Sequence, residues 1–315
     1  MSAPCLSVPL RMNPDNWSKK PHPPGNRTAN VVRATPDHLS WSQCKAFAAC
    51  PLQWWLSRRF APKSVASGLM FGSGFHAAVE AYYRAQLQGE ALALPDLLAA
   101  FDRHWAGELD GRQGRAALPI QWSAKEEDAA GARELAERML AAFLEERERR
   151  PSLVVAVEEP FRIVIGPDVP PLVGRIDLLE IRIDDDGIRR LHVVDWKTAA
   201  KRPSPSEIGS DQLHLYAMAA SDMRFVRELN LPLALRVEVV TKTKRPEVVT
   251  LAVEHSPKDV ARLAETIRHY WRAMSAGVHY PVSGWRCSGC GHAARCASWP
   301  ETMAAEALPD MRISA

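Results

Sequence analysis

The sequence predicts an α/β (or α+β) protein built around a mixed β-sheet, and the order of its segments is the reason. Helical patterns fill most of the chain up to about residue 150, and the first strand-like segment begins at residue 153. Three strands then follow one another up to residue 195, which is the pattern of an antiparallel meander. A helical segment and further strands come afterwards. This order favours one mixed sheet with helices on its flanks.

Bulk composition narrows the class of protein only slightly. The 315 residues are 46% hydrophobic, which is enough for a sizeable core, and the net charge of +3 does not by itself argue for nucleic acid. No stretch reaches the roughly 18 apolar residues of a membrane span, and the N-terminus lacks the pattern of a secretory signal. Six cysteines in a chain of this kind favour a metal site over a disulfide framework. We expect a cytoplasmic protein with no membrane partner.

Each helical segment before residue 150 has its own signal. Residues 1–34 are rich in Pro, Asn and basic residues and predict a disordered or loosely packed arm. The capping-box pair Ser40 and Gln43 starts a helix that breaks at Pro51, and a second helical piece follows. Further helices are expected at residues 72–88, opening at the glycines, at residues 93–107, and from the capping-box pair Ser123 and Glu126 to about Arg149.

The second half of the chain alternates between strand and helix signals. The composition of Asp184–Gly187 predicts a hairpin turn, and Ser256 followed by Pro257 starts a long final helix. Strand-like segments are residues 153–157, 161–165, 172–183, 191–194, 235–241 and 248–253, and a helix is expected at residues 206–229. We expect one domain over residues 35–300: mainly helical over 35–150, a sheet core over 151–255, a helix and cysteine cluster over 256–300, and a tail over 301–315.

Asp177, Asp195 and Lys197 are predicted to converge on one face of the hairpin. We expect Asp177 at the end of its strand, opposite the strand that carries the other two residues. Residues 195 and 197 share a strand face, whereas Trp196 points to the other. Two buried carboxylates repel each other unless a hard cation such as Mg²⁺ or Mn²⁺ compensates them. An ordinary surface hairpin with an exchangeable Asp–Lys pair fits the same pattern, so these residues alone leave the function open.

Four linked motifs, taken in order, make the chain resemble the RecB-like branch of the PD-(D/E)XK nuclease superfamily. That branch includes the nuclease domains of RecB and AddB and the CRISPR-associated RecB-like exonucleases. The resemblance covers about residues 36–300 and implies a restriction-endonuclease-like core with a large helical insertion. The motifs are Gly72-x3-His76-x3-Glu80, Gly174-Arg-Ile-Asp177, Val194-Asp195-Trp196-Lys197-Thr198 and, on one helix, Gln212-Leu-x2-Tyr216.

The resemblance implies a set of roles for these residues. Mg²⁺ or Mn²⁺ would be held by the side chains of His76, Asp177 and Asp195 and by the backbone carbonyl of Trp196. Lys197 would be the catalytic lysine, and Gln212 and Tyr216 would contact the active site or the substrate strand. Glu158 or Glu159 would be the acidic residue that often precedes the first core strand, and Glu80 shares a helix face with His76. The chain carries Asp195 where many superfamily members have Glu, and Ile176 where others have Pro.

The cysteines near the C-terminus form a second candidate site. Cys287, Cys290 and Cys296 have the spacing C-x2-C-x5-C, which alone fits zinc, an iron–sulfur cluster or reduced thiols. His292 makes a local Cys3His zinc site a competitor. The resemblance adds Cys50, which precedes Pro51, as a fourth ligand. It implies a structural [4Fe–4S] cluster that closes the C-terminus onto the N-terminal helix, with Zn²⁺ as the alternative and Cys44 as an alternative first ligand.

These features predict a metal-dependent DNA exonuclease. It would hydrolyse phosphodiester bonds on single-stranded or resected ends in repair, recombination, phage or CRISPR-related DNA processing. Arg58 and Arg59 are candidate phosphate contacts. The nearby tryptophans would either stack on bases or fill the helical core: Trp41, Trp54, Trp55 and Trp105.

Two alternatives remain open. One is a nuclease-fold DNA-binding or scaffold subunit of a recombination or CRISPR-adaptation complex that does not cut. The other is a zinc-stabilised binding module. The chain has no phosphate-binding loop of a helicase, so we expect any unwinding to come from a helicase or recombination partner.

Overall fold

The computed structural model describes residues 36–60, 64–109, 119–126, 128–207 and 209–299. The chain separates into two units, Met1–Arg33 and Ala34–Ala315, and every described residue belongs to the second unit. The expected arm over residues 1–34 and the expected tail over residues 301–315 lie outside the described residues. None of the helices in the described ranges has the length and apolarity needed to span a membrane.

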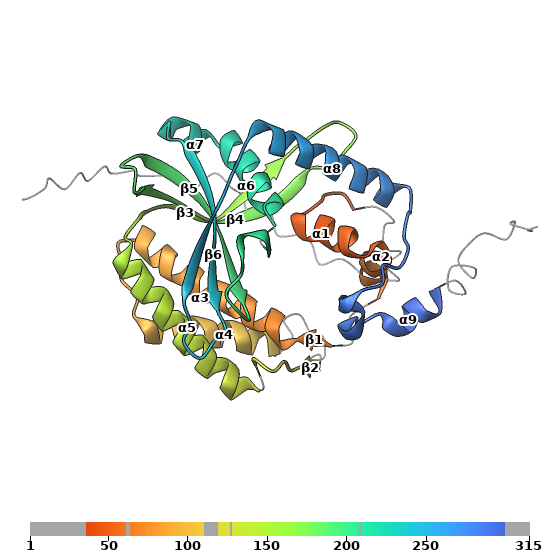
Figure 1. The fold of residues 1–315 in the computed structure, drawn as a ribbon, viewed down its shortest axis with the longest axis horizontal. Coiled ribbons are helices and arrows are strands. Elements are labelled where there is room, and N and C mark those ends of the chain that lie inside the picture. Colours follow the sequence, from red (N-terminus) through yellow and green to blue (C-terminus); the bar gives the residue numbers. More distant parts are fainter. Residues whose placement is uncertain (1–35, 61–63, 110–118, 127, 208, 300–315) are drawn as a thin grey trace, which may run out of the picture. The chain divides into compact units, whose positions relative to one another are not determined.

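A five-stranded mixed sheet forms the centre of this unit (Figure 1). Its strands, in spatial order, are β3 (Leu153–Ile163), β4 (Leu172–Ile183), β5 (Arg189–Ala199), β6 (Leu233–Thr241) and β7 (Val248–Val253). All neighbours pair antiparallel except β5 and β6, which pair in parallel. A parallel pair needs a crossover connection, and the helical segment between β5 and β6 supplies it. The predicted meander, mixed sheet and flanking helices are confirmed.

Helices cover both faces of the sheet. One face packs against α3 (Ser67–Leu87) and α5 (Ala129–Arg149), with α4 (Leu94–Leu109) outside α3. The other face packs against α6 (Asp211–Asp222), and α6 contacts α7 (Arg224–Leu229) and α8 (Pro257–Ser275). The remaining elements of the described ranges are α1 (Trp41–Ala49), α2 (Pro51–Arg59), β1 (Val65–Ala66), β2 (Ile120–Gln121), η1 (Pro205–Glu207), η2 (Trp285–Gly289) and α9 (Ala293–Ala297).

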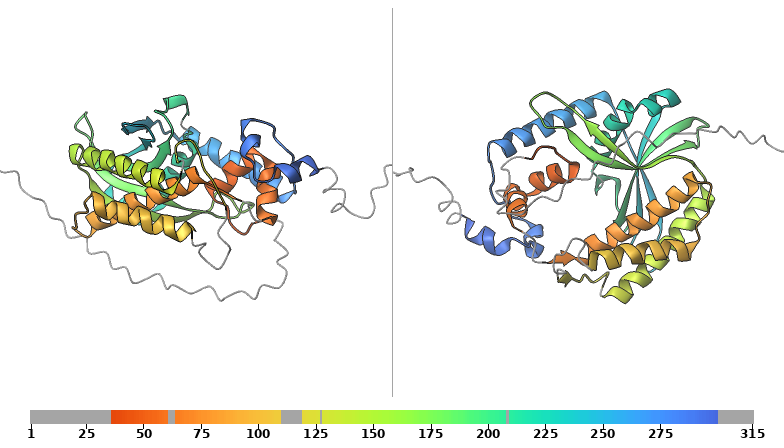
Figure 2. Two further views of the ribbon diagram at one scale, coloured as in Figure 1. Left: turned by 90° about the horizontal axis from the view of Figure 1, so that it is seen from below. Right: turned by 180° about the vertical axis from the view of Figure 1, so that it is seen from behind.

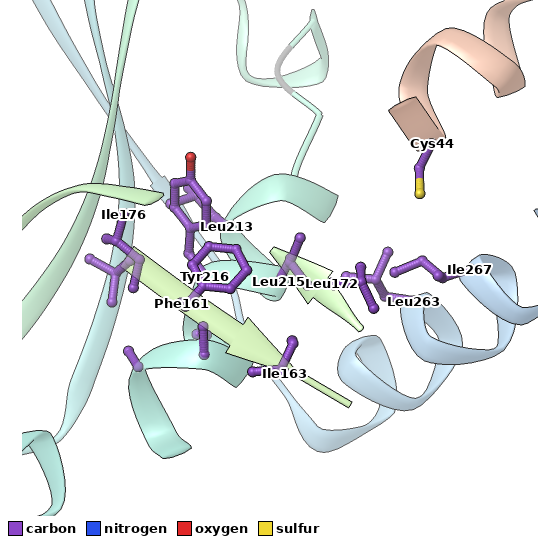
Figure 3. Close-up of a cluster of buried hydrophobic side chains, with 14 of the residues drawn as sticks. Cys44, Phe161, Ile163, Leu172, Ile176, Leu213, Leu215, Tyr216, Leu263 and Ile267 are labelled. Carbon is purple, nitrogen blue, oxygen red and sulfur yellow. The ribbon is translucent and has the colours of Figure 1, made fainter. Parts of the chain in front are cut away.

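The core consists of two apolar clusters, one on each face of the sheet. Strand β5 contributes to both because its side chains alternate: Val193 joins the cluster beneath α6, whereas Val194 and Trp196 join the cluster beneath α3 and α5. Figure 3 shows part of the first cluster, in which Tyr216 lies beside Phe161 of β3 and Ile176 of β4. The side of the sheet that carries Asp195 and Lys197 is therefore the α6 side.

Helix α3 begins five residues earlier than the sequence suggested. It starts at Ser67, so Gly72 and Gly74 lie inside the helix and do not open it. A Cβ atom on Gly74 would stand 3.0 Å from ring carbons of Phe101, which is tighter than ordinary contact. Gly74 therefore allows α4 to approach α3 closely, and packing outweighs the weak helix propensity of glycine.

Two further helix boundaries differ from the predictions. Helix α5 starts at the N-cap Asp128, whose Oδ1 accepts the Gly131 amide at 2.7 Å, and not at Ser123. Glu126, the supposed capping-box partner, is buried and pairs with Lys242. The predicted helix over residues 206–229 is two helices, because Met223 adopts an extended conformation between α6 and α7.

The predicted strands at residues 153–157 and 161–165 form one continuous strand, β3. Pro160 is tolerated within it because β3 is an edge strand, where a missing N–H leaves no partner unpaired. Glu158 has a φ of +49° in the middle of this strand. The hairpin turn at Asp184–Gly187 and the capping box of α8 at Ser256 are confirmed.

Candidate active site and cysteine pocket

Asp177 lies where strands β4 and β5 separate. The β4–β5 ladder ends at the pair Leu178 and Val194, whereas β5 continues its pairing with β6 as far as Ala199. Asp177 Oδ2 accepts the Trp196 amide at 2.9 Å, so a side chain satisfies a backbone donor that the ladder no longer reaches. Asp177 therefore lies inside β4, whereas the sequence had suggested that it lies at the end of the strand.

A chain of hydrogen bonds joins five of the predicted site residues. Lys197 Nζ donates to Asp195 Oδ1 at 2.7 Å and to Gln212 Oε1 at 3.2 Å. Gln212 Nε2 donates to the Tyr216 hydroxyl at 2.8 Å, and that hydroxyl donates to Asp177 Oδ1 at 3.3 Å. Two strands and helix α6 thus converge on one network, as the spacing of Gln212 and Tyr216 on one helix face predicts.

His76 joins this network from helix α3. Its Nδ1 atom lies 3.7 Å from Asp177 Oδ2, and its ring makes a hydrogen bond to the Trp196 backbone. Burial lowers the pKa of His76 and Lys197 lowers it further, although Asp195 opposes the effect, so the neutral imidazole is favoured. Glu80, one helical turn away, accepts Arg84 Nε at 2.7 Å.

Burial makes the charged forms of both carboxylates costly. Burial, opposed by Lys197 and aided by the neighbouring charge of Asp177, raises the pKa of Asp195 to about 6. Burial also raises the pKa of Asp177, against the effects of Lys197 and of the hydrogen bonds from Trp196 and Tyr216. A bound cation would lower the free-energy cost of the two buried carboxylate charges beside Lys197.

The structure distinguishes Glu158 from Glu159. Burial, together with the charges of Asp177 and Glu80, raises the pKa of Glu158 to about 7. Burial also raises the pKa of Glu159, but no neighbouring carboxylate contributes to that shift. Glu158 therefore lies on the Asp177 side of β3, and its left-handed backbone is the kind of local strain that accumulates at functional sites.

A buried layer on the opposite face of the sheet supports β5. Trp196 is 1% exposed and packs edge-on against Phe143, with the Arg147 guanidinium 5.3 Å from its ring. Arg147 in turn pairs with the buried Glu238 at 2.8 Å. Because Trp196 is held on one side, the side chains of Asp195 and Lys197 are held on the other.

The four predicted cysteine ligands line one pocket of about 480 Å³: Cys50, Cys287, Cys290 and Cys296. Cys50 is the N-cap of α2, and its sulfur accepts the amides of Gln53 and Val282, each at 3.4 Å. Burial raises the pKa of Cys296, and the neighbouring thiols of the other three add to the effect. The N-terminal cysteine and the three C-terminal cysteines therefore line the same pocket. In the described ranges, however, no three His, Cys, Asp or Glu side chains are arranged to hold a metal ion.

Of the two alternative ligands, Cys44 and His292, only His292 lines the cysteine pocket. Cys44 is fully buried in the core and does not line the pocket. His292 is 6% exposed, and its Nε2 lies 3.2 Å from the Ser57 hydroxyl. His292 does line the cysteine pocket, so a zinc site of three cysteines and one histidine stays an alternative.

Most of the N-terminal tryptophans fill the core and do not form a stacking surface. Trp54, Trp55 and Trp105 are each no more than 7% exposed. The two predicted phosphate contacts sit over these rings, with Arg58 at 5.4 Å from Trp54 and Arg59 at 3.7 Å from Trp55.

Sequence reasoning missed three residues near these sites: Lys45, Trp285 and Arg286. Lys45 and Arg286 line one pocket although they are far apart in the chain, so no local spacing connects them. The one available signal was a tryptophan beside an arginine in a segment without an apolar repeat.

Comparison with protein families supports the same class of protein. The family profile described as the PD-(D/E)XK nuclease superfamily matches residues 38–297. A protein from Eubacterium rectale, provisionally named an exonuclease, aligns over 92% of this chain and 97% of its own, with 12% identity and a TM-score of 0.45. The crystal structure of a protein named SSO0001 aligns over 82% of this chain and 95% of its own, with 15% identity and a TM-score of 0.32. No curated protein matches the sequence.

Proposed function

Because the chain belongs to the PD-(D/E)XK nuclease superfamily, we propose that it is a metal-dependent DNA exonuclease of the RecB-like branch. Its substrates are single-stranded or resected DNA ends in repair, recombination, phage or CRISPR-related processing. The observation that carries the proposal is the hydrogen-bond network that joins Lys197, Asp195 and Asp177 through Gln212 and Tyr216. All five are motif residues, and they converge from three separate elements.

The donor atoms around Asp177 and Asp195 are of the type that a hard divalent cation takes, although within the described ranges His76, Asp177 and Asp195 are not arranged to hold a metal ion. Both carboxylates are buried with raised pKa values, so a cation that neutralises them relieves a cost already present in the fold. Asp177, Asp195, the neutral imidazole of His76 and the Trp196 carbonyl would hold Mg²⁺ or Mn²⁺. When bound, the cation would supply Lewis-acid polarisation of the scissile phosphate.

The chain's own groups have separable tasks. Lys197 is a half-exposed ammonium held by Asp195 and Gln212, so it can orient the attacking water or stabilise charge that develops on phosphate. Tyr216 holds Asp177, and Gln212 holds both Tyr216 and Lys197. Loss of either α6 side chain would loosen the site without removing a charged group.

We also propose a structural [4Fe–4S] cluster in the cysteine pocket. A water molecule occupies about 30 Å³ in the liquid, so a pocket of about 480 Å³ has room for a polyatomic cluster. Four cysteines suit such a cluster. Cys50 lies on the N-terminal pair of helices and the other three follow α8, so the cluster would join these segments.

The test is degradation of 5′- and 3′-labelled single-stranded DNA by anaerobically purified protein, with Mn²⁺ or with EDTA. Wild-type protein is expected to release label only with Mn²⁺, and the labelled end that is lost first gives the polarity. Lys197→Ala is expected to abolish cleavage while DNA affinity in EDTA stays close to wild type. Asp195→Ala is expected to abolish cleavage as well.

Two results would contradict the proposal. Cleavage by Lys197→Ala at the wild-type rate would mean that the assigned centre is wrong. A folded, iron-loaded wild-type protein that binds DNA but never cuts it would favour the scaffold alternative. Iron and zinc analysis of the same preparation separates the cluster from zinc, since one zinc and no iron per chain would reject the cluster.

A further inference from the structure

A basic pocket lies between helices α1 and α2 and Arg286 in η2. Its volume is about 390 Å³, and its lining includes Lys45, Arg58 and Arg286. Within the described ranges no carboxylate contributes to this lining. Three cations gathered in one pocket repel one another unless an anion is present. The chemistry of the pocket is therefore that of an anion site.

Buried polar atoms without partners surround the same pocket. Arg58 Nε, Gln43 Oε1 and Trp54 Nε1 are buried and have no hydrogen-bond partner among the described residues. Trp54 is only 5% exposed, so water does not readily satisfy its ring N–H. A buried donor without a partner costs about 1–3 kcal/mol. Two of these atoms are donors, which a phosphate oxygen would satisfy.

Contacts between distant segments build the pocket. Leu52 donates its amide to the Tyr280 carbonyl at 3.1 Å, and Ser57 lies within hydrogen-bond distance of His292. The α1–α2 pair and the segment of η2 and α9 lie side by side in both views of Figure 2. Arg286 is brought to Lys45 and Arg58 by these contacts.

Helix α1 connects the basic pocket to β4, the strand that carries Asp177. Leu39, just before α1, bridges to β4: its amide donates to the Pro171 carbonyl at 3.0 Å and its carbonyl accepts the Val173 amide at 2.8 Å. Lys45 follows on α1. Partial burial lowers the pKa of Lys45, and the positive charges of Lys197 and Arg286 also lower it. The negative charge of Asp195 has the opposite effect. Lys45 thus interacts electrostatically with both the centre and the pocket.

A large aromatic side chain is exposed beside the pocket. Trp285 is 82% exposed, and the Arg286 guanidinium lies 5.1 Å from its ring. An exposed tryptophan beside arginine is the combination on which unpaired bases stack. Bases in a duplex are already stacked and paired, so this platform favours a single strand.

We propose that the basic pocket binds a backbone phosphate of a single-stranded nucleic acid, and that Trp285 stacks on one of its bases. The proposal rests on the proposed nuclease function, because it treats this strand as the substrate that continues to Asp177, Asp195 and Lys197. DNA and RNA share the phosphate and the stacking face. Lys45, Arg58 and Arg286 act on binding and do not touch the reacting atoms.

The test is binding of a fluorescent 20-nucleotide oligo(dT) in EDTA, where no cleavage occurs, measured over a range of salt concentrations. Lys45→Gln, Arg58→Gln and Arg286→Gln are each expected to weaken binding at least several-fold. Each lost phosphate contact lowers the slope of log affinity against log salt by about 0.7 for single strands. The triple variant should therefore lower the slope by about 2 if each cation meets a phosphate charge.

One control variant matches these changes, and one further variant tests the stacking. Arg138→Gln alters an exposed arginine on α5 that does not line the pocket, and its affinity and salt slope should equal wild type. Trp285→Ala is expected to weaken oligo(dT) binding about tenfold while leaving binding to a blunt duplex of equal length unchanged. An oligo(rU) arm of the experiment distinguishes RNA from DNA.

The outcomes separate this proposal from the proposed function. A folded triple variant, with wild-type circular dichroism and melting temperature, that keeps wild-type affinity and salt slope would reject the pocket even if the protein cuts DNA. Pocket-dependent binding by a protein that never cuts would support the pocket and reject the nuclease. If the triple variant does not fold, the three single variants decide the result.

Discussion

Replacement of Asp195 by Asn is expected to stabilise the metal-free protein at pH 8. Asp195 has a side chain that is 3% exposed, and burial, with the charge of Asp177, raises its pKa from 3.8 to about 6. Each pKa step of one corresponds to 1.36 kcal/mol, so the charged form costs about 3 kcal/mol of folding free energy. Asn fills the same volume without that charge. Lys197, which loses its ionic partner, is 40% exposed and stays hydrated.

The sign of the pH dependence follows from a pKa that is raised in the folded state. Between pH 4 and about pH 6 the unfolded chain loses the Asp195 proton before the folded chain does. Wild-type stability therefore falls, relative to the variant, as pH rises through this window. The difference should be close to zero near pH 4 and should reach its full value above about pH 7.

Thermal melts in EDTA at several pH values between 4.5 and 8 measure this difference. At about 2–4 °C per kcal/mol, a difference of about 3 kcal/mol means that the variant should melt about 6–12 °C above wild type at pH 8. Saturating Mn²⁺ should reverse the order, because only wild type keeps both carboxylates to bind it. Asp185→Asn makes the same chemical change at an exposed turn residue and should alter stability by less than about 0.5 kcal/mol. A variant that is less stable than wild type at pH 8, or a difference that does not change with pH, would refute the reasoning.

Three other changes test the remaining parts of the site. Glu158→Gln is expected to raise the Mn²⁺ concentration needed for half-maximal cleavage by about tenfold, because Glu158 is the β3 carboxylate that interacts with Asp177. Measuring the cleavage rate over a range of Mn²⁺ concentrations tests this. Gly174→Ala is expected to destabilise the fold by about 1–3 kcal/mol, because its Cβ would lie 2.6 Å from the Phe161 ring; urea unfolding measures this. Cys290→Ser is expected to lower the iron content per chain and the melting temperature, as measured by metal analysis and calorimetry.

Each of these variants has a matched control. Glu159→Gln should keep the wild-type Mn²⁺ dependence, and equal losses in both glutamate variants would remove the distinction between them. Gly209→Ala, at a site with nothing within 4 Å, should be neutral, and an equal loss there would make the Phe161 contact irrelevant. Cys44→Ala should keep its iron because Cys44 does not line the pocket, so iron loss in this variant alone would overturn the ligand set.

Much of the fold follows from local sequence signals. The turn residues Asp184–Gly187 predict the β4–β5 hairpin. The helical segment between β5 and β6 accounts for their parallel pairing. Errors arose where a distant contact overrode the local signal. Glu126 looks like a capping residue but pairs with Lys242, which is 116 positions away. Gly74 looks like a helix start but fits against Phe101 of another helix.

The residue set of the candidate site was predictable because each member belongs to a motif with fixed spacing. Asp195 and Lys197 share a strand face, and Gln212 and Tyr216 share a helix face, so periodicity alone pairs them. The choice between Glu158 and Glu159 was not predictable. It depends on the backbone turning to a positive φ within an edge strand, which no neighbouring residue in the sequence indicates.

By itself, the sequence determined the class of protein and supplied the groups to which we assign the chemistry. Those properties depend on residue types at short spacing, and short spacing is fixed by backbone geometry. Only the tertiary structure decided that β4 and β5 separate at Asp177 and that Asp177 and Asp195 are buried enough for their pKa values to rise. It also decided that Lys45 and Arg286 line one pocket. Burial and the meeting of distant charges depend on how the whole chain packs, and no local pattern carries that information.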